Sequence, residues 1–147
     1  MIRKNSLLPP SYLFIYIILA VILHLLFPIK NIVGTYRVLG IIPITFGLAI
    51  NIWADNLFKK KKTTVKPNKI PTYLITEGPF SFSRNPMYLG FVSLLLGVAT
   101  VLGSLSSFIA PILMFLTLEK KFIPLEEKQM EKYFGKKYRQ YKSRVRR

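Results

Sequence analysis

The amino-acid sequence predicts an all-α integral membrane protein with about four transmembrane helices. Hydrophobic residues make up 51% of its 147 residues, yet the formal net charge is +16. A water-soluble domain rarely combines these values, but they are compatible when apolar residues contact lipid and basic residues gather on one membrane face. The length suits one domain, and nothing in the composition divides 1–147 into two.

Two apolar segments in the N-terminal half predict the first two spans, at about 11–27 and 36–58. The first segment holds no formal charge and one histidine, which is sufficient for a short span. Arg3 and Lys4 precede it as in a signal peptide, but no small-residue cleavage site follows, so we predict a retained span. Trp53, near the end of the second segment, lies at the depth where aromatic belts form.

A charge-free run of 33 residues, Pro86–Leu118, predicts two further spans. As one helix it would be about 50 Å long, which exceeds a bilayer core of roughly 30 Å. The small and polar residues of Gly103–Ser107 supply a turn in its middle. We therefore expect a tight helical hairpin with spans at 86–102 and 106–122.

The basic residues are distributed unevenly between the predicted connections. Two precede the first span, two lie at 28–37, seven at 59–85 and eleven from Lys120 onward. With four spans, the N-terminus, the 59–85 loop and the tail at 124–147 share one side, which carries 20 of the 22 basic residues. The positive-inside rule places this side, with both termini, in the cytoplasm.

The tail at 124–147 is expected to form a cytosolic amphipathic helix. Pro124 and the two glutamates that follow suit a first helical turn, where acids meet the positive end of the helix dipole. Gly135 is expected to bend or divide the helix. The helix would lie on an anionic membrane surface or pack beneath the spans as a cap. Its apolar stripe recurs at three- and four-residue steps and comprises Met130, Tyr133, Phe134, Tyr138, Tyr141 and Val145.

Composition argues against several kinds of chemistry. The chain has no cysteine and one histidine, so we predict no disulfide, no thiolate nucleophile and no metal site. It has no Gly-x-Gly loop of a soluble nucleotide-binding domain. Topology accounts for the basic residues without a recognition motif, so we predict no nucleic-acid partner. The spans also lack the paired intramembrane charges expected of a transporter.

Three further polar features each allow two interpretations. His24, inside the first span, either hydrogen-bonds to a neighbouring helix or contacts a substrate, and we favour the hydrogen bond. Asp55 either pairs with a nearby lysine or faces a site. The run Lys59–Lys62 is either a topology anchor or a site for an anionic lipid headgroup, and we favour the anchor.

The segment Thr76–Gly90 is a dense cluster of polar and turn-forming residues between a lysine-rich loop and a long apolar run. Within it, Arg84–Pro86 matches a helix start, with an interfacial arginine, an asparagine N-cap and a proline at the first helical position. That interpretation does not account for Gly78–Phe80 upstream, or for Tyr88 one turn into the helix. The cluster therefore suggests a site where a span meets water.

Glu126 and Glu127 are ambiguous in the same way. Acids in a first helical turn stabilise the helix by about 0.3–1 kcal/mol each and need no other role. However, the chain holds only six acids against 22 bases. A cationic ligand approaching so basic a protein would need such carboxylates.

Together the two clusters resemble one family. Gly78-Pro79-Phe80-x-x-x-Arg84-Asn85-Pro86-x-Tyr88-x-Gly90 is similar to the Gly-x-Tyr-x-x-x-Arg-His-Pro-x-Tyr-x-Gly signature of the isoprenylcysteine carboxyl methyltransferases, whose wider relatives include phospholipid N-methyltransferases. Glu126-Glu127, followed by Phe134-Gly135-x-x-Tyr138-x-x-Tyr141, is similar to the second motif of that family. The resemblance covers about Tyr73 to Val145.

The resemblance implies an integral-membrane enzyme that uses S-adenosylmethionine in a pocket roofed by cytosolic segments. A strand-like stretch at 73–75 would line the cofactor, and Glu126 would hold its amino group. Arg84 and Asn85 are the implied catalytic residues. The implied cofactor-binding residues are Tyr73, Leu74, Ile75, Phe80, Asn85, Pro86, Met87, Tyr88, Glu126 and Glu127.

Elementary chemistry agrees with this assignment, because a sulfonium cation that also carries an ammonium group suits carboxylates and aromatic faces. The expected acceptor is lipophilic or lipid-like. Phe122 stands where the prenylcysteine enzymes carry an arginine for the substrate carboxylate, so a lipid amine or another small lipophilic acceptor fits at least as well. The alternative is a non-catalytic lipid-binding or scaffold protein derived from the same family.

Overall fold

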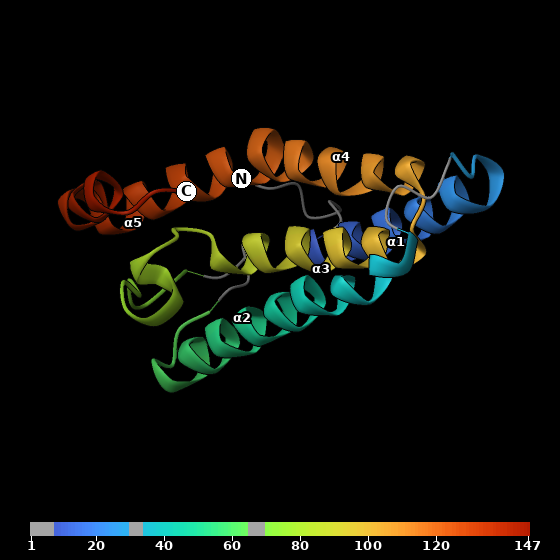
Figure 1. Ribbon diagram of the computed structural model, residues 1–147. Coiled ribbons are helices and arrows are strands. Elements are labelled where there is room, and N and C mark those ends of the chain that lie inside the picture. The colour runs from blue at the N-terminus through green and yellow to red at the C-terminus, as the bar shows by residue number, and fades with distance from the viewer. Residues whose placement is uncertain (1–7, 30–33, 65–69) are drawn as a thin grey trace.

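The computed structural model describes residues 8–29, 34–64 and 70–147, and these residues form an all-helical structure without strands (Figure 1). The predicted all-α class is therefore confirmed. Arg3, Lys4 and part of the predicted 59–85 loop lie outside the described residues. The principal helices are α1 (Pro9–Leu26), α2 (Ile41–Lys60), α3 (Pro86–Leu102), α4 (Ile109–Thr117) and α5 (Ile123–Arg144).

The helices match the predicted apolar segments closely. α3 coincides with the segment predicted at 86–102, since Pro86 occupies its first turn and Gly103, with a φ of 76°, ends it in the left-handed conformation. Two segments, Pro9–Leu26 and Tyr36–Lys60, are long and apolar enough to cross a membrane, and α3 is a shorter apolar helix. A 3-10 helix, Gly34–Gly40, overlaps the start of the second segment and leads directly into α2.

α2 and α3 form the most extensive contact between helices, and glycines let their backbones approach closely. A Cβ atom added to Gly47 would lie 2.5 Å from the carbonyl oxygen of Gly90. One added to Gly97 would lie 2.5 Å from the carbonyl oxygen of Gly40. Small residues at such crossings are typical of helices that associate within membranes.

At the end of the bundle where α1 finishes, polar side chains join α1 to the turn between α3 and α4. His24 Nδ1 lies 2.9 Å from Ser104 Oγ, which confirms the predicted hydrogen bond to a neighbouring helical element. Ser106 Oγ donates to the carbonyl oxygens of Leu23 at 3.1 Å and Phe27 at 2.6 Å. These bonds tie the last turn of α1 to the turn between α3 and α4, in addition to the backbone bonds that the same carbonyl oxygens accept from the amides of Phe27 and Ile29.

Pro124 and Glu126 lie in the first turn of α5, as predicted, but the preceding helix does not end before that turn. The chain passes from α4 through a π-helical segment, Leu118–Phe122, into α5 without leaving the helical conformation, so α4 and α5 follow one another in Figure 1. The wider π turn ends just before Pro124, where the proline ring would clash with a regular α-helical carbonyl group.

Gly135 divides α5, as predicted. Its backbone has a φ of 50° and a ψ of −120°, and the chain beyond it turns back (Figure 1). Tyr141 then donates a hydrogen bond of 2.7 Å to the carbonyl oxygen of Phe80. Tyr138 and Tyr141 pack in one apolar cluster with Ala54 of α2 and with Phe80. This end of the chain therefore forms a cap on the helices, which agrees with one of the two arrangements expected.

The strand-like conformation expected at 73–75 is also wrong. The backbone there is irregular, because no neighbouring strand supplies hydrogen bonds. The side chain of Thr63 replaces a strand partner, since its Oγ1 accepts bonds from the amides of Thr72 at 3.1 Å and Tyr73 at 3.3 Å.

The close contact between α2 and α3 predicts the effect of a single substitution. In Gly47→Val, the added side chain would meet the backbone of α3, and such overpacking costs about 1–3 kcal/mol. We expect a lower thermal unfolding midpoint in detergent micelles. Ala49→Val, at an exposed position of the same helix, is the control and should leave the midpoint unchanged. Equal midpoints for the two variants would contradict this packing.

Candidate active site

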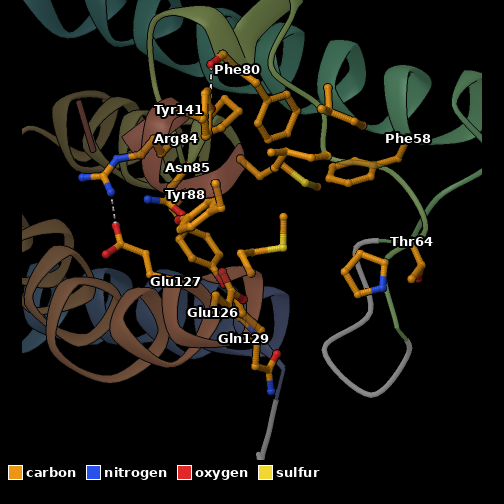
Figure 2. A pocket seen from close by; sticks show the side chains of 18 of the residues that line it. Phe58, Thr64, Phe80, Arg84, Asn85, Tyr88, Glu126, Glu127, Gln129 and Tyr141 are labelled. Carbon is orange, nitrogen blue, oxygen red and sulfur yellow. Dashed lines mark hydrogen bonds and ion pairs between the residues drawn. The ribbon is translucent and has the colours of Figure 1, made fainter. Parts of the chain in front are cut away.

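A cavity of about 310 Å³ lies where the 71–85 segment, the start of α3 and α5 meet (Figure 2). This volume lies at the lower end of the range of about 300–1,000 Å³ for small-molecule sites. Every residue predicted to act on or bind a ligand contributes to its lining: Tyr73, Leu74, Ile75, Phe80, Arg84, Asn85, Pro86, Met87, Tyr88, Glu126 and Glu127.

The lining also includes residues that were not predicted. Gln129 and Met130 follow Glu126 by three and four residues, so helical periodicity alone could have placed them on the same face of α5. Phe91 stands in the same relation to Tyr88. By contrast, Leu8–Pro10 at the start of α1 belongs to a segment without any site signal, and only the tertiary structure brings it to the cavity.

A hydrogen bond between Tyr88 and Glu126 connects the two sequence motifs. The Tyr88 hydroxyl donates to Glu126 Oε1, and the two residues are 38 positions apart in the chain. Burial raises the pKa of Glu126 to about 7, although the bond from Tyr88 acts in the opposite direction. Glu126 is therefore a carboxyl group whose charge changes near neutral pH.

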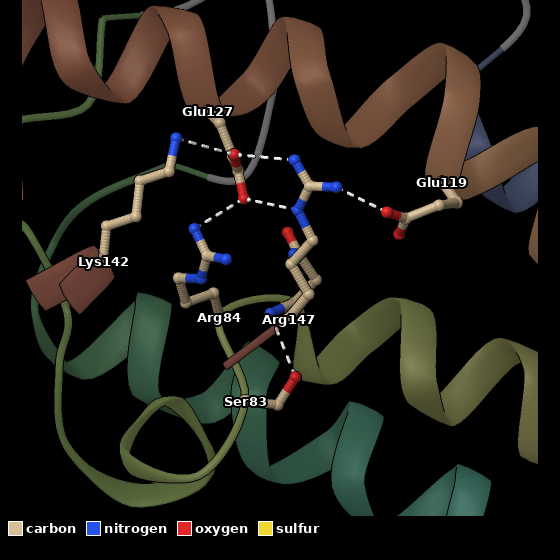
Figure 3. Close-up of polar contacts among 7 residues, drawn as sticks. Ser83, Arg84, Glu119, Glu127, Lys142 and Arg147 are labelled. Carbon is tan, nitrogen blue, oxygen red and sulfur yellow. Dashed lines mark hydrogen bonds and ion pairs between the residues drawn. The ribbon is translucent and has the colours of Figure 1, made fainter. Parts of the chain in front are cut away.

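Glu127 lies in a different environment, although it is the next residue. Its side chain is surrounded by basic groups: Arg84 Nη1 at 2.7 Å, Lys142 Nζ at 3.1 Å, and Arg147 Nε and Nη2 at 3.0 and 3.1 Å (Figure 3). Burial alone would raise its pKa, but the bonds from Arg147 and Lys142 and the charge of Arg84 together lower it below the usual value. Glu127 is therefore an ionised anchor that is only 5% exposed.

Arg84 and Asn85 place buried donors at the cavity. Asn85 occupies the N-cap position of α3, but its side chain makes no capping bond, so that part of the helix-start interpretation is wrong. Its Nδ2, and Nε of Arg84, are buried and have no hydrogen-bond partner within the described part of the chain. The Arg84 side chain is 10% exposed, so it is not the interfacial anchor considered above. Buried donors of this kind indicate an acceptor supplied by a ligand or water.

The opposite side of the cavity is aromatic. Phe80 packs edge-to-face against Phe58, with ring centroids 5.4 Å apart and an interplanar angle of 90°. Figure 2 shows both rings across the cavity from Glu126 and Gln129. The cavity therefore combines a polar wall, which carries the carboxyl groups and buried donors, with an aromatic wall.

The remaining polar features of α2 lie outside this cavity. Asp55 forms an ion pair of 2.6 Å with Lys59, which agrees with the first of its two interpretations. Lys61 pairs with Glu77, and its Nζ lies 5.1 Å from the centroid of the Tyr73 ring. Phe122 is likewise outside the lining; it is buried in the core and packs against the ring of Tyr12.

Comparisons with known proteins identify the family of the chain. The family model described as phospholipid methyltransferase matches residues 35–137. The chain therefore belongs to the phospholipid methyltransferase family, which confirms the resemblance derived from the motifs.

A curated relative gives a second match. Over 75 residues the chain is 36% identical to the protein-S-isoprenylcysteine O-methyltransferase of Schizosaccharomyces pombe. This match covers 49% of the chain and 30% of the relative, so the chain spans less than a third of that protein. No solved structure matches the chain significantly.

The raised pKa of Glu126 predicts a pH-dependent gain in stability for Glu126→Gln. Folding raises this pKa from 4.5 to about 7, so the ionised form is disfavoured in the folded protein. The resulting penalty is absent below pH 4.5, grows between pH 4.5 and 7, and is complete above pH 7, where it reaches at most about 3 kcal/mol. We expect the unfolding midpoint of Glu126→Gln to exceed that of the wild type at pH 8 but not at pH 4.5.

Glutamine keeps an acceptor for the Tyr88 hydroxyl, so the substitution tests the charge alone. Glu131→Gln is the matched control, because Glu131 lies in the same helix with a side chain that is 43% exposed. If the difference in unfolding midpoint between the wild type and Glu126→Gln does not change with pH, the raised pKa of Glu126 is contradicted.

Proposed function

We propose that this protein is an integral-membrane methyltransferase that uses S-adenosylmethionine to methylate a small lipophilic or lipid-like acceptor. The observation that carries the proposal is the hydrogen bond between Tyr88 and Glu126, which joins both family motifs at one cavity. Membership of the phospholipid methyltransferase family supports the same reaction.

The residues present suit this cofactor in charge and in hydrogen bonding. Glu126 offers a carboxylate to the cationic groups of the cofactor, and the aromatic faces of Phe80 and Tyr88 offer further cation contacts. Asn85 Nδ2 and Arg84 Nε are donors without partners among the described residues, and a carboxylate is the acceptor that they need. Glu127 holds Arg84 in place through the 2.7 Å ion pair.

The chemistry requires alignment more than acid–base groups. When bound, the cofactor supplies an electrophilic methyl group, and a bond forms from the acceptor atom to the methyl carbon while the carbon–sulfur bond breaks and its electron pair stays on sulfur. An acceptor atom that carries a proton then releases it to solvent, whereas a tertiary amine keeps the positive charge and releases none. The protein has to align the reactants and exclude water, and the packed rings of Phe58 and Phe80 suit that task. Asn85 cannot titrate, so it takes part as a hydrogen-bonding group.

The proposed membrane arrangement has four spans, with the cavity and both termini on the cytoplasmic side. Its support is the combination of apolar helices with exposed apolar side chains, such as Leu25 at 69% and Phe14 at 65%. Exposed apolar surface on this scale is unfavourable in water and favourable in lipid. The cavity lies at the end of the bundle that carries Lys59 and the basic helix α5, where the positive-inside rule predicts the cytoplasm.

The proposed acceptor is a lipid amine or another small lipophilic molecule. Phe122, at the position where the prenylcysteine enzymes carry an arginine, packs against Tyr12 and contributes no cation to the cavity. Apolar residues from three helices instead contribute to the lining, including Pro9, Phe91 and Met130.

Binding of labelled S-adenosylmethionine to protein in lipid nanodiscs tests the cofactor assignment. We expect saturable binding by the wild type and binding at least about tenfold weaker in Glu126→Gln, since a lost charge-assisted hydrogen bond is worth about 1.5–3 kcal/mol. Glu131→Gln removes an equal charge outside the cavity and should bind like the wild type. No saturable binding by the wild type, or equal binding by all three proteins, would contradict the assignment of S-adenosylmethionine as the cofactor.

Mass spectrometry of host lipids and metabolites tests catalysis. Cells fed with methyl-labelled methionine should accumulate a labelled lipophilic product when they express the wild type, and not when they express Glu126→Ala. Cofactor binding without any labelled product would instead favour the non-catalytic alternative. A predominance of labelled prenylcysteine methyl esters would contradict the acceptor proposed from Phe122.

A further inference from the structure

The π-helical segment between α4 and α5 places two acids on one side of the long helix. Glu119 lies within this segment and Glu127 lies eight residues later. In a regular α-helix, eight residues would leave the two side chains about 80° apart around the axis. The wider π turn rotates less per residue and therefore reduces this offset. Figure 3 shows both carboxylates directed towards the same guanidinium group.

That guanidinium group belongs to Arg147. Its Nη1 donates to Glu119 Oε1, while Nε and Nη2 donate to the two oxygens of Glu127 at 3.0 and 3.1 Å. The contact with Glu127 is therefore a bidentate pair, which fixes the geometry of both partners more strictly than a single ion pair does. We call Glu119, Glu127 and Arg147 the Arg147 latch.

The latch continues into the cavity wall through two links. The first is the ion pair between Glu127 and Arg84, whose side chains are 6% and 10% exposed. The second is a backbone hydrogen bond of 2.9 Å, in which the Arg84 amide donates to the carbonyl oxygen of Arg146. The residue that follows Arg84 is Asn85, which carries the unpartnered buried donor. The position of Arg147 therefore affects both the side chain and the backbone of Arg84.

We propose that Arg147 is a positioning residue of the cavity: through the latch it holds the segment after Gly135 against the helix that precedes Gly135, and so fixes Arg84 and Asn85 in the cavity wall. Arg147 does not line the cavity. The expected effect of Arg147 on S-adenosylmethionine binding rests on the proposed function. Its expected effect on the order of the 81–86 segment does not.

A nearby arginine provides a matched control. The Arg146 side chain is exposed and makes no hydrogen bond or ion pair within the described residues, and its substitution leaves the backbone carbonyl in place. Arg146→Ala and Arg147→Ala therefore remove the same charge from adjacent positions. Arg147→Lys keeps the charge but loses the planar fork, and Glu119→Gln weakens the second attachment of the latch.

The test combines hydrogen–deuterium exchange with binding of labelled S-adenosylmethionine, both in nanodiscs. In Arg147→Ala we expect faster exchange in the 81–86 and 136–147 segments and binding at least about fivefold weaker, as for two energetically coupled sites. Arg147→Lys and Glu119→Gln should show exchange rates and binding affinities between those of Arg147→Ala and the wild type. Arg146→Ala should match the wild type in both measurements.

The outcomes separate this inference from the proposed function. If Arg147→Ala matches Arg146→Ala in exchange and binding, the inference is overturned. If exchange rises only at 136–147, the latch fastens the chain end locally and the positioning role is again overturned. If the wild type binds no S-adenosylmethionine, the proposed function fails, and exchange at 81–86 alone decides whether Arg147 positions the cavity wall.

Discussion

The site depends on one contact, the hydrogen bond between Tyr88 at the start of α3 and Glu126 near the start of α5. It exists because α4 continues through the π-helical segment into α5, so the second motif is held beside the first by a helix rather than by a loop. The close contact between α2 and α3 in turn fixes the start of α3. A break before Pro124 would free Glu126 and leave the cavity without its titrating acid.

The two adjacent glutamates have separate roles because their surroundings differ. Glu127 is neutralised by Arg84, Lys142 and Arg147, so it organises the protein and stays ionised. Glu126 is partly buried and has no basic partner among the described residues, where its only polar contact is the hydroxyl of Tyr88. Such a group is costly in an empty cavity and becomes favourable when a cation binds, which is the property expected of a cofactor-binding carboxylate.

Much of this arrangement could be predicted from the sequence, since apolar segments and turn residues located the helices and two motifs located the cavity. The failures have physical reasons. The π turn carries no clear sequence signal, so the helix was expected to restart at Pro124. The segment at 73–75 has strand-like residues but bonds to Thr63 instead of a strand. The side-chain directions of Asn85 and Arg84 depend on Glu127 and on the chain beyond Gly135, which local patterns do not reveal.

The central claim is that a cation binding in this cavity ionises Glu126, and calorimetry at pH 7 in buffers of different ionisation enthalpy tests it directly. Because the pKa of Glu126 is raised to about 7, S-adenosylmethionine binding should release a fraction of a proton from the wild type beyond any proton exchanged by the ligand itself. In Glu126→Gln, the measured proton release is that of the ligand alone. Equal proton release by the two proteins would contradict the account.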